Sequence, residues 1–104
     1  GLIAACVSPE IIENTIDEIK QLKIPFGFKA NLWKVEEPVP VHKFASPMDK
    51  IGSNPVETMG TRDDYSDAKF LEFSKKMIDM GATILGGCCE TKPSHINKIL
   101  SLKN

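Results

Sequence analysis

Apolar and polar positions along the chain predict alternating strands and helices. Residues Leu2–Ala5 form a short apolar run, which is typical of a buried strand. Ser8, Pro9 and Glu10 then give a helix start, with a capping hydroxyl, a proline in the first turn and an early acid. The isoleucines that follow recur at helical spacing, so we predict an amphipathic helix from Pro9 to about Leu22. Its apolar stripe consists of Ile12, Ile16 and Ile19.

The rest of the chain repeats this arrangement. A short strand is predicted over Pro25–Ala30 and another over Ala82–Leu85. Between them lies a predicted helix over Asp67–Met80, which ends at Gly81, where a glycine commonly terminates a helix. Pro93 opens a last helix. Strands that alternate with helices predict an α/β fold with a parallel sheet.

The segment 33–66 does not read as regular structure. It holds four of the seven prolines, and a connection of this length in a compact domain is usually functional or disordered. The chain contains no internal repeat and no low-complexity tract.

Length and charge limit the class of protein. A chain of 104 residues is the size of one small domain. Its 13 basic and 14 acidic residues give a net charge of −1, which argues against a nucleic-acid partner. No apolar run approaches the roughly 18 residues that a membrane span needs, and no secretory signal pattern is visible. We therefore expect no membrane partner and a cytoplasmic location.

The three cysteines, Cys6, Cys88 and Cys89, are the most informative residues. An odd count without a secretory signal argues against a disulfide framework. Cys88 and Cys89 can share one metal ion if the backbone turns beside them, and we expect Gly86 and Gly87 to supply that freedom. Three thiolates on one ion leave one tetrahedral position open, the pattern of a catalytic zinc site. On composition alone, buried cysteines explain the pattern equally well, because free cysteine packs as a small hydrophobe.

Position in the predicted fold favours the metal site. Cys6 follows the first predicted strand, and Cys88 and Cys89 follow the third, so all three lie at the carboxyl ends of strands. Parallel strands end at one edge of their sheet, and in α/β barrels that edge carries the active site. We therefore expect the three cysteines to meet although most of the chain separates them. Asn31, at the end of the middle strand, is expected between them.

With these residues in place, the sequence resembles the homocysteine S-methyltransferase family. The resemblance rests on Cys6 in Ala-Ala-Cys-Val-Ser-Pro-Glu and on Gly-Gly-Cys-Cys-Glu-Thr-Lys-Pro-Ser-His-Ile at 86–96. The segment Phe28–Trp33, followed by a long proline-bearing loop, is most similar to the betaine–homocysteine methyltransferase branch. The resemblance covers essentially the whole chain. It implies that residues 1–104 are the incomplete C-terminal part of a homocysteine-binding domain, strands six to eight of a TIM-type (β/α)8 barrel.

The resemblance also implies a reaction and a site. The family transfers a methyl group to the thiol of homocysteine to give methionine, so homocysteine and a methyl donor are the implied partners. Zinc is the implied cofactor, with no catalytic residue beyond the metal site. Gly86 and Gly87 would let the amino-acid end of homocysteine approach the backbone. Asn31 would be a polar substrate contact or a fourth metal ligand, and a strand-end turn residue is its other interpretation. The implied zinc ligands are Cys6, Cys88 and Cys89.

Two residues depart from the family pattern. The family commonly continues Cys-Cys-Gly-Thr-Thr-Pro, whereas this chain has Glu90 and Lys92. Lys92 stands where a hydroxyl would cap the last helix, a loss of about 1 kcal/mol at most. Glu90 brings a carboxylate to the edge of the sheet that carries the three cysteines. For His42 and His95 we favour surface or packing roles over metal binding, and we interpret Trp33 as a loop anchor.

Two other classes of protein stay open. A thiol redox or metal-binding protein would use Cys88 and Cys89, but the Cys-x-x-Cys motif typical of that class is missing. A non-catalytic or truncated zinc-binding barrel remnant would keep the shape without the activity. A three-stranded parallel piece has open edges and a bare inner face. We therefore expect the chain to be poorly stable alone, to form a homo-oligomer, or to be an excerpt of a longer product.

Overall fold

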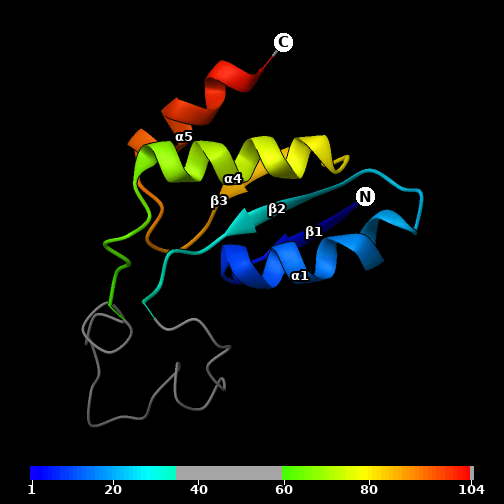
Figure 1. Ribbon diagram of the computed structural model, residues 1–104, viewed down its shortest axis with the longest axis horizontal. Coiled ribbons are helices and arrows are strands. Elements are labelled where there is room, and N and C mark those ends of the chain that lie inside the picture. The colour runs from blue at the N-terminus through cyan, green and yellow to red at the C-terminus, as the bar shows by residue number, and fades with distance from the viewer. Residues whose placement is uncertain (35–59, 104) are drawn as a thin grey trace, which may run out of the picture.

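The computed structural model describes residues 1–34 and 60–103, in which strands and helices alternate (Figure 1). This alternation confirms the predicted α/β class. None of the helices in the described ranges is both long and apolar enough to cross a membrane. The described elements are β1 (Leu2–Ala5), α1 (Pro9–Lys20), β2 (Phe26–Ala30), α4 (Asp67–Asp79), β3 (Ile84–Gly87), α5 (Pro93–Ile99) and the 3-10 helix η2 (Leu100–Leu102).

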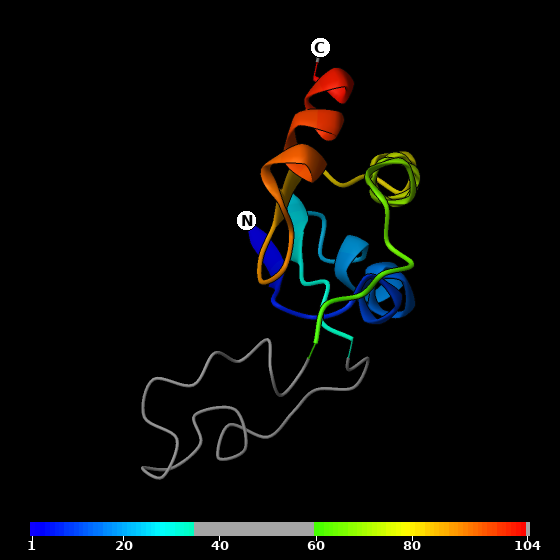
Figure 2. The same ribbon diagram turned by 90° about the vertical axis from the view of Figure 1, so that its left-hand side faces the viewer.

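The three strands form one parallel sheet in the order β1-β2-β3. In this register Phe28 of β2 lies opposite Ala4 on one side and Leu85 on the other. Helices α1 and α4 lie on the same side of the sheet (Figure 2). The arrangement agrees with strand–helix units of the predicted kind. Three strands do not close a barrel, so the TIM-type architecture stays a prediction.

The hydrophobic core lies between the sheet and the helices α1 and α4. Ile12 and Ile16, one turn apart on α1, are fully buried, as are Phe28 of β2 and Phe70 of α4. The rings of Phe28 and Phe73 meet edge to face with their centroids 4.8 Å apart, a geometry that adds about 1 kcal/mol to the burial of the two rings. The apolar stripe predicted for the first helix therefore faces the core.

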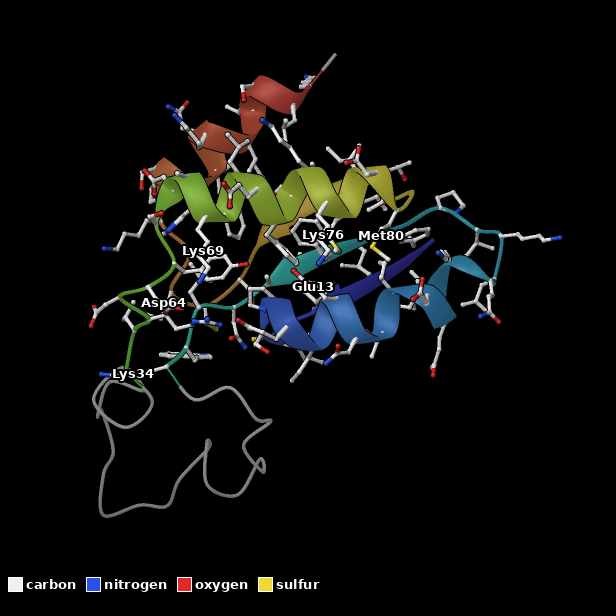
Figure 3. The ribbon with its side chains drawn as sticks, in the orientation of Figure 1. Glu13, Lys34, Asp64, Lys69, Lys76 and Met80 are labelled. Carbon is white, nitrogen blue, oxygen red and sulfur yellow. The ribbon has the colours of Figure 1, made fainter. Side chains whose placement is uncertain are left out.

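An exposed ion pair joins the two helices above this core. Lys76 Nζ of α4 lies 3.0 Å from Glu13 Oε2 of α1 (Figure 3). Both side chains are substantially exposed, and such pairs contribute between about 0 and 1 kcal/mol. The buried apolar side chains beneath the pair are therefore the main contribution to holding α1 against α4.

The third strand is displaced from its predicted position. We predicted Ala82–Leu85, whereas β3 covers Ile84–Gly87, so Gly86 and Gly87 belong to the sheet. Their pairing with β2 satisfies the backbone polar groups, which outweighs the low strand propensity of glycine. The other predicted boundaries agree with the structure to within about two residues.

Ser8 fixes the start of α1, just after the cysteine that ends the first strand. Its Oγ accepts a hydrogen bond from the Ile11 backbone N–H at 3.3 Å, and the residue is buried. We expect Ser8→Ala to lower the free energy of unfolding by about 1 kcal/mol, because a partly buried backbone donor in the first turn of α1 loses its partner. The midpoint of urea unfolding measures this loss. Ser101→Ala, which removes an exposed hydroxyl, is the control, and equal shifts for both variants would contradict the capping role.

Candidate metal centre

The carboxyl ends of the strands bring the cysteines to one edge of the sheet. The backbone N–H of Cys6 donates to the Lys29 carbonyl at 2.9 Å, and the N–H of Cys88 donates to the Ala30 carbonyl at 2.8 Å. The end of β2 thus holds the end of β1 on one side and the end of β3 on the other. This is the edge at which the sequence analysis placed the candidate site.

The three cysteine sulfurs lie close together. The Sγ of Cys89 is 3.6 Å from the Sγ of Cys6 and 3.9 Å from the Sγ of Cys88. All three atoms lie within 4.8 Å of one another. A disulfide bond needs about 2.05 Å between sulfurs, and all three thiols are free. The structure therefore brings together the three sulfurs that were expected to converge.

Two of the three sulfur spacings fit a single tetrahedral metal ion. Zinc–thiolate bonds of about 2.3 Å at tetrahedral angles place neighbouring sulfurs about 3.8 Å apart. The two shorter distances between the cysteine sulfurs lie on either side of that value. Three soft thiolates suit Zn²⁺ and leave the fourth tetrahedral position for another ligand. The donor set and two of its three spacings thus fit a zinc site with three thiolate ligands, and the sulfurs of Cys6 and Cys88, which lie within 4.8 Å, would approach each other on binding the ion.

Electrostatics couple the thiols. Burial, the hydrogen bond with Cys6 and the charge of the neighbouring thiols together raise the pKa of Cys89 to about 12. Burial also raises the pKa of Cys6, but hydrogen bonds with Cys88, Cys89 and Asn31 outweigh it and leave the pKa of Cys6 below its usual value. Ionisation of one sulfur therefore opposes ionisation of the next. A divalent cation bound among the sulfurs resolves this conflict, because it favours the thiolate form of every ligand.

The backbone bends around the site occur at residues other than glycine. Cys6 has φ 58° and Glu90 has φ 62°, both in the left-handed region. Gly86 and Gly87 lie in β3 instead, so the prediction that they supply the turn is wrong. The chain turns at Cys6 itself and directly after Cys89. Each left-handed residue with a side chain costs about 1–2 kcal/mol, which neighbouring contacts must offset.

Gly87 has a different role, which involves Thr91. A Cβ on Gly87 would lie 2.2 Å from Thr91 Oγ1, and that hydroxyl donates to the Cys88 carbonyl at 2.6 Å. The missing side chain therefore lets Thr91 fold back and hold the Cys88 backbone. Our sequence analysis missed Thr91. The available signal was a hydroxyl residue three positions after Cys88, a spacing at which such side chains bond to the backbone.

Asn31 lies between the cysteine-bearing strand ends, as expected. It is 7% exposed. Its Nδ2 donates to the Cys6 carbonyl at 2.8 Å, and its Oδ1 accepts from the Trp33 backbone N–H at 3.3 Å. The side-chain amide is thus engaged with the backbone at both ends.

A pocket lies beside Glu90, the residue after Cys89, and the sequence analysis did not anticipate it. The Thr61 hydroxyl donates to the carboxylate of Glu90, which ties the segment before α4 to the residue after Cys89. The pocket has a volume of about 400 Å³ and contains charged groups of both signs. No local pattern indicates the Thr61–Glu90 contact, because it depends on how distant segments pack. The lining includes Leu32, Thr61, Arg62, Asp67, Glu90 and Lys92.

Arg62 organises the wall of this pocket. Its side chain is only 6% exposed and lies 2.7 Å from Glu10 and 2.8 Å from Asp64. The guanidinium carbon lies 4.8 Å from the centre of the Tyr65 ring. Asp64 also pairs with Lys69 at 3.3 Å (Figure 3). Arg62 therefore links the segment before α4 to the first turn of α1, in the pocket that Glu90 also lines.

The Arg62 pairs predict a pH dependence of stability. Hydrogen bonds from Arg62 hold the pKa values of Glu10 and Asp64 below their usual range. Carboxyls with lowered folded-state pKa values stabilise the fold above their unfolded values of about 4, and this contribution is lost as the pH falls through the folded values. Arg62→Gln should therefore lower the free energy of unfolding more at pH 6 than at pH 2. We expect the two losses to differ by about 1 kcal/mol, because both carboxyls are half-exposed and their ion pairs are weakened by solvent. Urea unfolding at the two pH values measures it, and a difference that does not change with pH would contradict the account.

His95 is a packing residue. It is buried, its Nδ1 accepts from the Lys92 backbone N–H at 2.9 Å, and its Nε2 lies 3.1 Å from the Tyr65 carbonyl oxygen. The imidazole thereby contributes to the N-terminus of α5, where the Lys92 side chain makes no capping bond. Trp33 is buried, in agreement with its interpretation as an anchor. His42 lies outside the described residues.

A parallel α/β sheet that gathers three free thiols at its carboxyl edge has the form of a thiolate metal centre. The sequence model of the homocysteine S-methyltransferase family matches residues 1–102 of the chain. The chain therefore belongs to the homocysteine S-methyltransferase family.

Two curated relatives match a shorter segment of the chain. Two proteins named homocysteine S-methyltransferase 1, from Brassica oleracea var. italica and Arabidopsis thaliana, are each 49% identical to the chain over 35 residues. That segment is 34% of this chain and 11% of each relative. The match thus spans about a tenth of the relatives' length. No solved structure matches the chain.

Proposed function

We propose that this chain forms the metal-binding rim of an enzyme that transfers a methyl group to the thiol of homocysteine, giving methionine. The observation that carries the proposal is the triangle of sulfurs formed by Cys6, Cys88 and Cys89, in a chain that belongs to the homocysteine S-methyltransferase family. These cysteines would hold zinc. The fit of the sulfur spacing to one tetrahedral ion supports that assignment.

The reaction needs a thiolate nucleophile at neutral pH. An alkyl thiol with a pKa of about 8.5 is mostly protonated there. Zinc held by Cys6, Cys88 and Cys89 would supply the missing chemistry by favouring the thiolate form of the substrate sulfur. The substrate sulfur would form a bond to the methyl carbon of a cationic donor. The bond between that carbon and the donor's nitrogen or sulfur breaks, its electron pair stays with the donor, and the thiol proton leaves to solvent.

The chain's own residues would position the substrate. Gly86 and Gly87 line the strand end next to the cysteines, and a Cβ at Gly86 would meet the Lys29 side chain at no less than 3.4 Å, so the rim beside Gly86 is sterically open. We propose that the amino-acid part of homocysteine lies along this backbone, with Asn31 as the polar residue nearest to Cys6. The pocket beside Glu90 provides charges of both signs for a zwitterion.

The architecture of the whole enzyme is part of the proposal. The three parallel strands with their helices would be the C-terminal units, strands six to eight, of a TIM-type barrel. The cysteines at the carboxyl edge support this, because that edge carries the active sites of such barrels. The remaining strands would contribute most contacts to the substrate and donor. The chain itself would then be one part of a longer enzyme, and free thiols agree with a cytoplasmic location.

The identity of the methyl donor is the most specific part of the proposal. We propose a betaine-type donor, on the similarity of Phe28–Trp33 and the following loop to the betaine–homocysteine methyltransferase branch. A donor panel of betaine and S-methylmethionine tests it. Methionine formation from betaine alone would support the assignment, and formation from S-methylmethionine alone would contradict it.

The test of the proposed function combines zinc analysis with an activity assay. The chain is loaded with zinc, freed of excess metal, and incubated with homocysteine and each donor while methionine is quantified. About one zinc per chain with homocysteine-dependent methionine formation is the expected result for a complete enzyme. Zinc without turnover would support a non-catalytic or partial metal-binding unit. A chain that retains no zinc would overturn the proposal.

A further inference from the structure

Cys6 adopts a backbone conformation that its own side chain disfavours. Its φ of 58° lies in the left-handed region, which costs about 1–2 kcal/mol for a residue with a Cβ. Such conformations persist only when surrounding contacts determine them. Cys6 is also an exposed residue at the end of an edge strand, where burial contributes little. The Cys6 N–H pairs with the Lys29 carbonyl, and a further specific contact must hold the backbone on its carbonyl side.

The side chain of Asn31 provides that contact. Its Nδ2 donates to the Cys6 carbonyl at 2.8 Å, while its Oδ1 accepts from the Trp33 backbone N–H at 3.3 Å. The backbone N–H of Asn31 also donates to the Val7 carbonyl at 3.0 Å. Two consecutive carbonyls, those of Cys6 and Val7, are thus bonded to one residue. Because Asn31 is 7% exposed, its side of these bonds is shielded from competing water.

We propose that Asn31 is a positioning residue for the metal centre: it holds the left-handed backbone of Cys6 and thereby aims the Cys6 sulfur at the sulfurs of Cys88 and Cys89. The inference rests on the proposed function, since it treats Cys6 as a metal ligand. An amide is suited to this role because one rigid group combines a donor and an acceptor. Asn31 is thus assigned an action through Cys6, both on its backbone carbonyl and beside its sulfur.

Zinc affinity provides the first test. Asn31→Leu and Asn31→Ser remove the bond to the Cys6 carbonyl, and Ser is the variant with the smaller side chain. We expect each to raise the Kd for zinc by about 10- to 100-fold, the usual effect of removing a residue that orients a ligand. Competition with a chromophoric chelator measures Kd. Ser74→Ala is the matched control, because it removes another buried side-chain donor to a backbone carbonyl, that of Phe70 at 2.8 Å, without contact to the cysteines.

A double-mutant cycle separates positioning from general destabilisation. If Asn31 acts through Cys6, then Asn31→Leu has little further effect on zinc affinity in a Cys6→Ser background, so the two changes are strongly non-additive. Additive effects, or an unchanged Kd in both Asn31 variants, would overturn the inference while leaving the proposed zinc site intact. A wild-type chain that binds no zinc would overturn both. Circular dichroism on each variant verifies that the compared proteins are folded.

Discussion

We expect Cys88→Ser to abolish stoichiometric zinc retention. Removing one of three thiolates leaves two, and a serine hydroxyl is a poor replacement because it stays protonated at neutral pH. Structural zinc sites with four ligands bind with about 10–16 kcal/mol, or roughly 3 kcal/mol for each ligand. The variant should therefore bind zinc at least about 100-fold more weakly. Elemental analysis after gel filtration, together with chelator competition, measures the change.

His95→Asn is the control for this experiment. His95 is a buried residue of a metal-ligating type, but both its ring nitrogens engage the backbone. Its replacement should lower stability and leave zinc stoichiometry unchanged. A Cys88→Ser protein that still holds one zinc per chain would refute the assignment of Cys88 as a ligand. Loss of zinc in His95→Asn with the fold intact would place a histidine in the site.

The second large effect is expected for Gly27→Ala in the middle of the sheet. A Cβ at Gly27 would lie 2.0 Å from the Ile84 carbonyl oxygen and 2.4 Å from the Ile84 Cβ. Neither atom belongs to a flexible chain end, so β2 and β3 must separate. We expect a loss of about 3 kcal/mol or more in unfolding free energy, a large fraction of the stability of a small domain. Urea unfolding followed by circular dichroism measures it.

The same substitution should weaken metal binding, because the pairing of β2 with β3 brings Cys88 to the rim. Gly86→Ala is the matched control on the neighbouring strand. Its Cβ would meet the Lys29 Cγ at 3.4 Å, an ordinary contact with a flexible side chain, and we expect a change below about 1 kcal/mol. Equal unfolding midpoints for Gly27→Ala and wild type would contradict the close approach of the two strands.

Much of the fold could be predicted because its determinants are local. The capping residue Ser8 and the isoleucine stripe on α1 define a helix within one short segment. The meeting of Cys6 with Cys88 and Cys89 was predictable for a different reason, since parallel strands place their carboxyl ends at one edge whatever their separation in the chain. The sulfur spacing then follows from how the strand ends pair.

The detailed contacts around the three cysteines could not be predicted, because they depend on segments that are distant in the sequence. Glycine adopts turn conformations readily, yet Gly87 lies in β3 and Glu90 takes the left-handed conformation. The ion pair of Arg62 with Glu10 and the contact of Thr61 with Glu90 join segments with no shared local pattern. Asn31 was correctly placed between the strand ends, but its bond to the Cys6 carbonyl depends on the side-chain packing of the folded rim.

X-ray absorption at the zinc edge of the zinc-loaded chain tests the central claim most directly. The account predicts three sulfur neighbours at about 2.3 Å and one lighter atom in the first shell. Addition of homocysteine should raise the sulfur count to four. A first shell with two or fewer sulfurs in the protein alone would contradict the convergence of Cys6, Cys88 and Cys89 on one ion.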